Sequence, residues 1–257
     1  GFQDSIILSF GKPKTAIYAH MDSIGFTVKY NNEIIKIGGP VVKNGIELIG
    51  SDSKGKIKGK IIKKNEKIFI DFKREIDRGT SLTFKMNFKE DNDYIQSCYL
   101  DNRLGVWNAL KVAENLEDGI IVFSCWEEHG GGSVGFLTNF IHTKYNINQA
   151  LISDITWVTE GVKAGEGVAI SLRDSGIPRK KFVNKIIDLA KKNNISYQLE
   201  VESSGGSDGN EIQKSPIPVD WCFIGAAEQN VHSPKEKVHK DDIKSMVDIY
   251  EMLMKEL

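Results

Sequence analysis

Two adjacent glutamates, Glu127 and Glu128, stand where a predicted buried strand with the apolar run 120–123 meets three consecutive glycines. Two carboxylates crowded together at such a point repel each other unless a cation lies between them. Other residue types that bind metals recur at the ends of further predicted strands and in one late loop: His20, Asp22, Asp101, Asp154 and His232. Because an open α/β sheet has its crevice beyond the carboxyl ends of its strands, these scattered residues can converge on one site. The pattern predicts a metal-dependent hydrolase.

Taken singly, each of these residues has an ordinary structural alternative. His20 and Asp22 are two positions apart, so on a strand they face the same way and the carboxylate can orient the imidazole ring. A histidine at a strand end is more often simply hydrogen-bonded, and an aspartate in front of a predicted helix, such as Asp101, is usually an N-cap. Asp154 also suits a turn cap, and His232 suits a loop. Only the combination of these residues favours metal binding.

The elements that must position these residues alternate between strands and helices. We expect strands at residues 5–10, 16–20, 97–100, 119–126, 149–155 and 167–172, and helices at about 102–117, 133–145, 179–192 and from 241 onward. In the first of these helices Leu104, Trp107, Leu110, Ala113 and Leu116 share one face, which we expect to pack on the sheet. The alternation predicts an α/β fold with a largely parallel sheet covered by helices on both faces.

Between Ile24 and about Tyr94 the chain changes to short β-branched runs with frequent glycines and many lysines. In residues 54–62 the lysines alternate with small or apolar residues, as in a half-exposed strand. We expect residues 24–94 to form a small inserted β-barrel-like domain that serves dimerisation or substrate access. Residues 1–23 and 95–257 would form one discontinuous catalytic domain.

The composition argues against several classes of partner. The chain has 34 lysines and arginines against 35 acidic residues, a net charge of -1, so no overall field favours nucleic acid or an anionic membrane. No apolar run approaches the roughly 20 residues that span a bilayer, and no secretory signal opens the sequence. The three cysteines, Cys98, Cys125 and Cys222, are widely spaced without a C-x-x-C pair. This spacing favours reduced thiols and a cytoplasmic protein.

The candidate residues form motifs in a definite order along the chain: His20-x-Asp22, Leu100-Asp101-Asn102-Arg103, Trp126-Glu127-Glu128, Asp154 and His232-Ser233-Pro234. This order resembles the glutamyl aminopeptidase and tetrahedral aminopeptidase family of dinuclear zinc metallopeptidases, in which a small β-domain interrupts a catalytic α/β domain. The most specific parts are the segment from Ala19 to Gly25, the 100–103 motif, the two glutamates with their glycines, and Gly205-Gly-Ser-Asp208. The resemblance extends from about Ala19 to the C-terminus.

The resemblance implies a zinc-peptidase-like sheet and two divalent metal ions, zinc in the first place, with cobalt or manganese as alternatives. His20 and Asp154 would complete one metal site, Glu128 and His232 would complete the other, and Asp101 would bridge both. These residue types suit the chemistry, because zinc accepts imidazole and carboxylate ligands. A bridging carboxylate can hold two ions about 3.5–4 Å apart.

By the same resemblance, Glu127 would be the general base that takes a proton from water and passes it to the departing amine. Asp22 would fix the ring of His20. The substrates would be peptides with a free N-terminus, whose α-amino group the second metal would bind. We also expect Ser207 and Asp208 to line the substrate cleft. The protein would be a homo-oligomer, with a dimer as the simplest expectation, because the β-module is short and little helical sequence precedes the first strand.

A serine esterase is a competing interpretation. Gly205–Gly209 fits the G-x-S-x-G nucleophile elbow with Ser207 as the nucleophile, and His232 follows in the right order. Only residues 210–214 separate the elbow from a Ser-Pro pair, which is short for the helix that must back such a nucleophile. A third hypothesis is a catalytically silent relative that binds peptides, although a purely structural metal site would not need the additional base Glu127.

Overall fold

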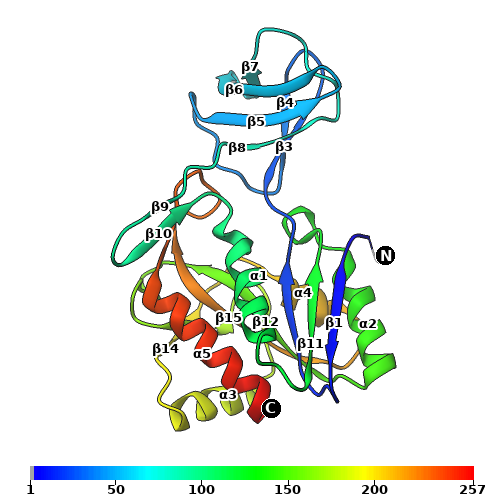
Figure 1. Ribbon diagram of the computed structural model, residues 1–257, viewed down its shortest axis with the longest axis vertical. Helices are drawn as coiled ribbons and strands as arrows, with labels where there is room; N and C mark the ends of the chain where they lie inside the picture. Colours follow the sequence, from blue (N-terminus) through cyan, green and yellow to red (C-terminus); the bar gives the residue numbers. More distant parts are fainter. Residues whose placement is uncertain (1–2) are drawn as a thin grey trace.

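The computed structural model describes residues 3–257, which form a large mixed sheet covered by helices and a smaller antiparallel sheet (Figure 1). Residues 1 and 2 of the predicted segment 1–23 lie outside the described residues. The strands of the large sheet are β1 (Ile6–Phe10), β2 (Ala16–His20), β9 (Lys89–Glu90), β10 (Tyr94–Ser97), β11 (Gly119–Ser124), β12 (Gln149–Trp157), β13 (Val168–Arg173), β14 (Tyr197–Val201), β15 (Asp220–Gln229) and β16 (Glu236–His239). The helices are α1 (Leu100–Ala113), α2 (Ser133–Tyr145), α3 (Lys180–Lys192), α4 (Asp208–Lys214) and α5 (Lys240–Glu256), and η1 (Glu127–His129) is a 3-10 turn. Within the described range, none of these helices has the length and apolar character needed to cross a membrane.

The large sheet is organised around four parallel strands in the order β11-β2-β12-β15. Strand β2 is buried along its whole length, and its residues alternate between two separate cores. Ile17 and Ala19 belong to the core under α1, α3 and α5, whereas Ala16 and Tyr18 belong to the core under α2 and α4. Because both faces are covered, β2 is apolar at successive positions rather than at every second one. The predicted α/β fold with helices on both faces is confirmed.

The edges of this sheet are more mixed than predicted. Strand β1 is antiparallel to β11, and both β13 and β16 are antiparallel to β15. The short loop between β15 and β16 explains why these two strands are antiparallel, since parallel neighbours can be joined only by a longer crossover connection. The central strands are therefore parallel, and the candidate residues lie at their ends, whereas among the outer strands only the β13-β14 pair is parallel.

The buried face of α1 matches the predicted one only in part. Trp107 and Leu110 are 42% and 47% exposed. The helix instead approaches β12 through Gly105 and Asn108. A Cβ atom at Gly105 would lie 2.1 Å from the carbonyl oxygen of Ser153, and Asn108 Nδ2 donates a hydrogen bond to Ser153 Oγ at 2.9 Å. Leu104 is buried as predicted, and Ala113 and Leu116 pack against the same core, so the prediction was wrong only for Trp107 and Leu110.

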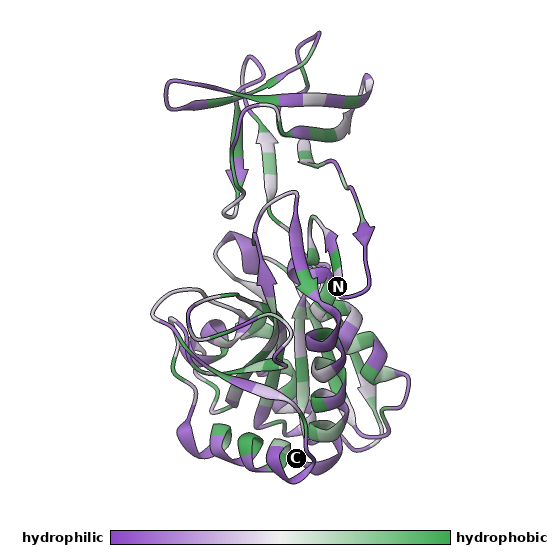
Figure 2. Ribbon diagram, turned by 90° about the vertical axis from the view of Figure 1, so that its left-hand side faces the viewer, coloured by the Kyte–Doolittle hydropathy of each residue, from purple (hydrophilic) through white to green (hydrophobic). Residues whose placement is uncertain are grey.

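The small sheet contains the six strands β3 (Gly25–Val28), β4 (Ile34–Ile37), β5 (Glu47–Asp52), β6 (Gly55–Lys64), β7 (Lys67–Asp71) and β8 (Ser81–Phe84), in the order β4-β3-β8-β5-β6-β7. A single bridge between Glu33 and Phe69 brings the two edges together, so the sheet is nearly closed like a barrel. In β6 the residues Ile57, Gly59 and Ile61 face inward while the lysines between them are exposed, as the alternation predicts. The sheet stands at one end of the molecule, beyond the end of β2 (Figures 1 and 2).

Candidate metal centre

The carboxyl ends of the parallel strands lie toward the small sheet (Figure 1), and the predicted metal ligands converge at these strand ends. His20 is the last residue of β2, and Asp154 lies near the end of β12. Asp101 lies in the first turn of α1, Glu128 in η1 after β11, and His232 in the loop between β15 and β16. Side chains that are up to 212 positions apart in the sequence thus line a single site.

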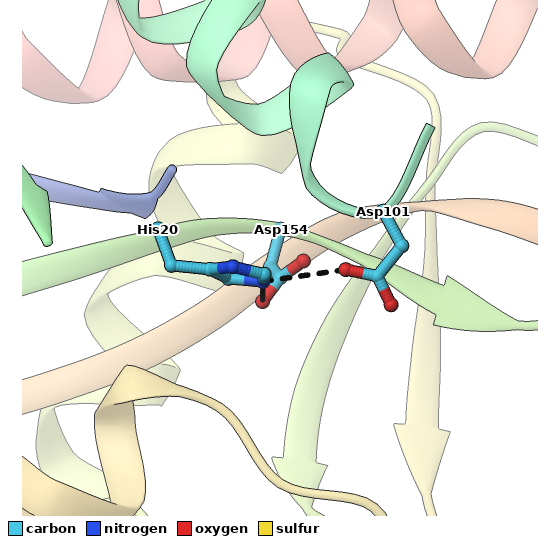
Figure 3. Close-up of side chains that lie close together, drawn as sticks. All are labelled: His20, Asp101 and Asp154. Carbon is cyan, nitrogen blue, oxygen red and sulfur yellow. Dashed lines mark ion pairs between the residues drawn. The ribbon is translucent and has the colours of Figure 1, made fainter. Parts of the chain in front are cut away.

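The first group of ligand atoms comes from His20, Asp101 and Asp154 (Figure 3). His20 Nε2 lies 3.2 Å from Asp101 Oδ1 and 3.4 Å from Asp154 Oδ2. His20 Nδ1 lies 3.1 Å from the backbone oxygen of Asp22, and this contact favours the tautomer with the proton on Nδ1. Nε2 then turns its lone pair toward two carboxylates, and this buried atom has no hydrogen-bond partner in the described chain. A cation bound between His20 Nε2 and the two carboxylates would give each of these groups a partner.

The second group comes from Asp101, Glu128 and His232. His232 Nε2 lies 3.2 Å from Asp101 Oδ2 and 3.4 Å from Glu128 Oε2. Asp101 therefore presents one carboxylate oxygen to each group. This is the arrangement expected of a bridging carboxylate between two cations.

Asp22 holds the turn that carries the two glutamates. Its carboxylate accepts hydrogen bonds from the backbone N–H groups of Glu127 at 3.2 Å and Glu128 at 3.1 Å. The same carboxylate is 3.6 Å from His20 Nδ1, farther than the backbone oxygen of Asp22 itself. Asp22 thus fixes the ring of His20 mainly through its carbonyl group. Glu127 belongs to neither ligand group, but its Oε2 lies 3.9 Å from His20 Nε2.

The protein groups alone carry more buried negative charge at this site than is favourable. Burial raises the pKa of Glu127 to about 9. The nearby His20 lowers this pKa and Asp154 raises it, but burial has the largest effect. Burial and Asp101 raise the pKa of Glu128 to about 8. Burial also opposes ionisation of Asp101, but its contacts with the two histidines outweigh this effect and lower its pKa to about 2. Divalent cations would stabilise all of these carboxylates in ionised form, so the donor set fits metal ions.

Two residues position Asp101: Glu236, which sequence reasoning missed, and Asn102, which belongs to the 100–103 motif. The Oε2 atom of Glu236 accepts hydrogen bonds from the backbone N–H of Leu100 at 2.6 Å and of Asp101 at 3.4 Å. Asn102, joined to Asp101 by a cis peptide bond, donates from Nδ2 to the Ser153 carbonyl oxygen and accepts at Oδ1 from Gly105 N–H. The N-cap alternative for Asp101 is therefore wrong, because Asn102 takes the capping role and leaves the Asp101 carboxylate to face the histidines.

The loop Gly38-Gly39 of the inserted segment packs against the second ligand group, another contact that sequence reasoning missed. A Cβ atom at Gly38 would lie 2.8 Å from the backbone oxygen of Glu128, and one at Gly39 would lie 3.1 Å from His232 Nδ1. Val41 N–H donates to the backbone oxygen of His232 at 2.9 Å. Gly38 also has a φ of +66°, a conformation that favours glycine. The only signal in the sequence was the Gly-Gly-Pro run itself.

A cavity of about 260 Å³ opens beside the two ligand groups. Its wall includes Glu127 together with four of the predicted ligands: Asp101, Glu128, Asp154 and His232. Ser207 and Asp208 are not part of this wall. They line a smaller hollow of about 190 Å³ that Glu127 also borders.

The environment of Ser207 does not form an esterase site. Its hydroxyl accepts a hydrogen bond from Gly209 N–H and thereby caps α4, which has only 7 residues. His232 faces Asp101 and Glu128, and no hydrogen bond joins it to Ser207 among residues 3–257. A nucleophile elbow needs a long helix and a histidine partner, so the esterase alternative is wrong.

Histidines and carboxylates cluster here at the strand ends of an open α/β sheet, with a further glutamate beside them. This arrangement is typical of metal-dependent α/β hydrolases. The chain belongs to the M42 glutamyl aminopeptidase family, whose sequence profile matches residues 50–249. A curated protein of Acetivibrio thermocellus, which carries a provisional aminopeptidase name, is 32% identical over 165 residues. This match covers 60% of the present chain and 49% of that protein, so it spans about half of the relative's length.

Solved structures of other proteins share the fold. An aminopeptidase of Desulfurococcus kamchatkensis superposes with a TM-score of 0.88 at 24% identity, over 98% of this chain and 82% of that one. The TET1 peptidase of Pyrococcus horikoshii superposes with a TM-score of 0.84 at 24% identity, over 98% of this chain and 87% of that one. That peptidase can assemble into a tetrahedron or a large octahedral shell. A dodecameric structure named PhTET1-12s superposes with a TM-score of 0.85 at 25% identity, over 98% of this chain and 86% of that one.

Proposed function

We propose that this chain is a dinuclear metal-dependent aminopeptidase that releases N-terminal residues from peptides. The observation that carries this proposal is the placement of Asp101, which offers one oxygen to the His20 group and the other to the His232 group. Membership of the M42 family supports the same activity. The presence of Glu127 beside these groups argues against the silent peptide-binding relative, because a purely structural metal site would not need a glutamate outside both ligand sets.

His20 and Asp154 would hold one ion, Glu128 and His232 the other, and Asp101 both. Zinc is our first choice, with cobalt or manganese as substitutes, because the set mixes imidazole nitrogen with carboxylate oxygen. When bound, the ions would polarise the carbonyl of the first peptide bond and make water reactive at neutral pH.

Glu127 would move the proton. Its carboxylate borders the cavity and lies beside His20 Nε2, so it can accept a proton from the attacking water and then deliver it to the nitrogen of the departing amine. Asp22 would hold Glu127 in place through the backbone hydrogen bond described above. Ser207 and Asp208 would shape the hollow on the other side of Glu127 and contact the substrate from there.

The restriction to free N-termini would follow from binding of the α-amino group, in its neutral form, to one of the two ions through the nitrogen lone pair. An acetylated terminus would lose this lone pair as a ligand and would add bulk. The substrates would thus be peptides with a free amino terminus.

We further propose that the protein is a cytoplasmic homo-oligomer. The oligomeric relatives named above support assembly, and the three free cysteines suit a reducing compartment. Residues 24–94 would act as a separate inserted domain, while 1–23 and 95–257 would form the catalytic domain. The contact of Gly38 and Gly39 with the second ligand group supports a role for the insertion in substrate access, besides dimerisation.

The experiment that tests this function compares free and N-acetylated peptides of identical sequence. The metal-stripped protein is reconstituted with Zn²⁺, Co²⁺ or Mn²⁺, and released residues are identified by mass spectrometry. We expect metal-dependent release of the first residue from free peptides only. Cleavage of the acetylated peptides at an equal rate would contradict the proposal, and inactivity with every metal despite two bound ions would favour the silent relative.

A further inference from the structure

The cavity at the metal centre continues into a second group of acidic residues that the proposed chemistry does not use. Asp174 follows β13, Glu200 lies on β14, and Glu202 follows β14, and all three line the cavity wall. Parallel pairing of β13 with β14 brings them together, and Glu202 N–H donates to the backbone oxygen of Arg173 at 2.9 Å. We call these three residues the acidic wall.

The acidic wall has no cation of its own. Asp174 and Glu200 are only 7% and 3% exposed, yet no ion pair involves either of them or Glu202 within residues 3–257. The bonds that they do accept come from neutral groups, with Gly176 N–H donating to Asp174 and Thr156 Oγ1 donating to Glu200. Burial raises the pKa of Asp174, and burial with the nearby Asp174 and Glu202 raises the pKa of Glu200. A cationic group from outside would relieve this unfavourable charge.

The acidic wall is joined to the strand that carries the predicted ligand Asp154. Thr156, the hydrogen-bond partner of Glu200, is two residues beyond the predicted ligand Asp154 on β12. At a rise of roughly 3.3 Å per residue, the two side chains are about 7 Å apart along the strand and point to the same face. This separation is close to the length of an extended lysine side chain. The lining of the same cavity also includes Trp157 and Phe223, which can contact the aliphatic part of such a side chain.

We propose that the acidic wall is the pocket for the side chain of the released residue and that it selects lysine and arginine. This inference rests on the proposed aminopeptidase function, because it places the α-amino end of the substrate at the metal centre. The ammonium or guanidinium group would meet Glu200 and Glu202, with Asp174 behind them. A glutamate side chain would be repelled by the same carboxylates, so the chain would reject acidic N-terminal residues despite the name of its family.

The test separates charge from shape by comparing lysine with norleucine, which has a straight side chain without the ammonium group. Peptides that differ only in a first residue of lysine, arginine, norleucine or glutamate are hydrolysed by the metal-reconstituted protein. Binding of free lysine and free norleucine is measured by calorimetry on the same protein, so that recognition is read independently of turnover. We expect lysine to be favoured over norleucine by about 10- to 100-fold in both measurements, the usual effect of a charged hydrogen bond.

Two variants locate the effect. Glu200→Gln keeps the shape of the side chain and a hydrogen-bond acceptor for Thr156, and Glu202→Gln changes a half-buried residue whose loss is easier for the fold to tolerate. Each should reduce the ratio of lysine to norleucine at least about tenfold. The control Glu160→Gln removes an exposed carboxylate three residues after β12, outside the cavity wall, and should leave the ratio unchanged.

The two proposals fail in different ways. Cleavage of lysine and norleucine peptides with equal kcat/KM would overturn the acidic wall as a selective pocket while leaving the aminopeptidase function intact. Tighter binding of lysine without cleavage of any peptide would support the pocket and overturn the aminopeptidase. Equal binding of both amino acids without cleavage would overturn both.

Discussion

The substitution Glu127→Gln separates proton transfer from metal binding. Glu127 lies outside both ligand groups, whereas the adjacent Glu128 has its Oε2 3.4 Å from His232 Nε2 inside one of them. The hydrogen bond from Glu127 to Asp22 uses the backbone N–H, so it survives any change of the Glu127 side chain. Glutamine has the same shape as glutamate but cannot carry the proton. We therefore expect an intact fold, full metal content and a large loss of turnover.

The expected loss is a factor of about 10² to 10⁴ in kcat, since a positioned general base contributes this much to a reaction. This factor corresponds to roughly 2.7–5.5 kcal/mol of transition-state stabilisation. KM should change little, because Glu127 would act on the water rather than on the bound side chain. The assay measures initial rates of residue release over a range of peptide concentrations, together with metal content by elemental analysis.

The matched control is Glu128→Gln, the same chemical change one residue away. It should lower metal affinity at least about tenfold, and added metal should partly restore its activity. If Glu127→Gln lost metal as Glu128→Gln does, Glu127 would have to be reassigned as a ligand. If Glu127→Gln kept more than about a third of the wild-type kcat, the general-base role would be refuted.

Three further outcomes follow from particular contacts. Asp101→Asn should weaken both metal sites at once, because each oxygen of Asp101 faces a different histidine; a variant that still binds two ions tightly by elemental analysis would contradict the bridge. Removal of metal by a chelator should lower Tm, since ligands that bind only the native state stabilise it by about 2.7 kcal/mol at a concentration of 100 Kd; an unchanged Tm in a calorimetric scan would count against tight binding. The hydrogen bond from Arg74 holds the pKa of Asp52 well below its usual range, so this pair stabilises the native state at pH values above about 4 and loses its effect as the pH falls further. In urea unfolding, Arg74→Met should therefore be less stable than wild type at pH 7, with a difference that shrinks at pH 3; an equal difference at both pH values would show that the ion pair is not the cause.

Much of the site could be predicted because parallel strands align their carboxyl ends. His20 closes β2 and Asp154 lies near the end of the neighbouring β12, so their convergence follows once the alternation of strands and helices is recognised. The order of the motifs along the chain added Asp101, Glu128 and His232. For these residues the type of side chain and its place after an element were visible in the sequence.

The supporting contacts could not be predicted, because they depend on pairings between distant segments. Glu236 accepts from the backbone of Leu100 only because β16 pairs with β10, the strand before α1, and nothing in the local sequence indicates this. Glu200 joins the cavity through Thr156, a neighbour that exists only after β14 has paired with β13. Long-range register of this kind has no local signal.

The packing of α1 shows a different limit. Large apolar residues such as Trp107 and Leu110 predict a buried face under the general rule of helical periodicity. In this helix the close approach of Gly105 to Ser153 brings α1 onto β12 and leaves Trp107 and Leu110 exposed, although Leu104 is buried as predicted. Periodicity identified the helix correctly, but the contact distance to the sheet decided which face is buried.

The most direct test of the central claim measures aminopeptidase rate against the number of metal ions bound. Metal-stripped protein is titrated with Zn²⁺, and after each addition the bound metal is quantified by elemental analysis and the release of residues from a free peptide is measured. The shared position of Asp101 predicts that the chain binds two ions and that activity reaches its maximum at two per chain. Full activity in protein that contains no metal, or a maximum at one ion per chain with no second ion bound, would contradict a dinuclear centre.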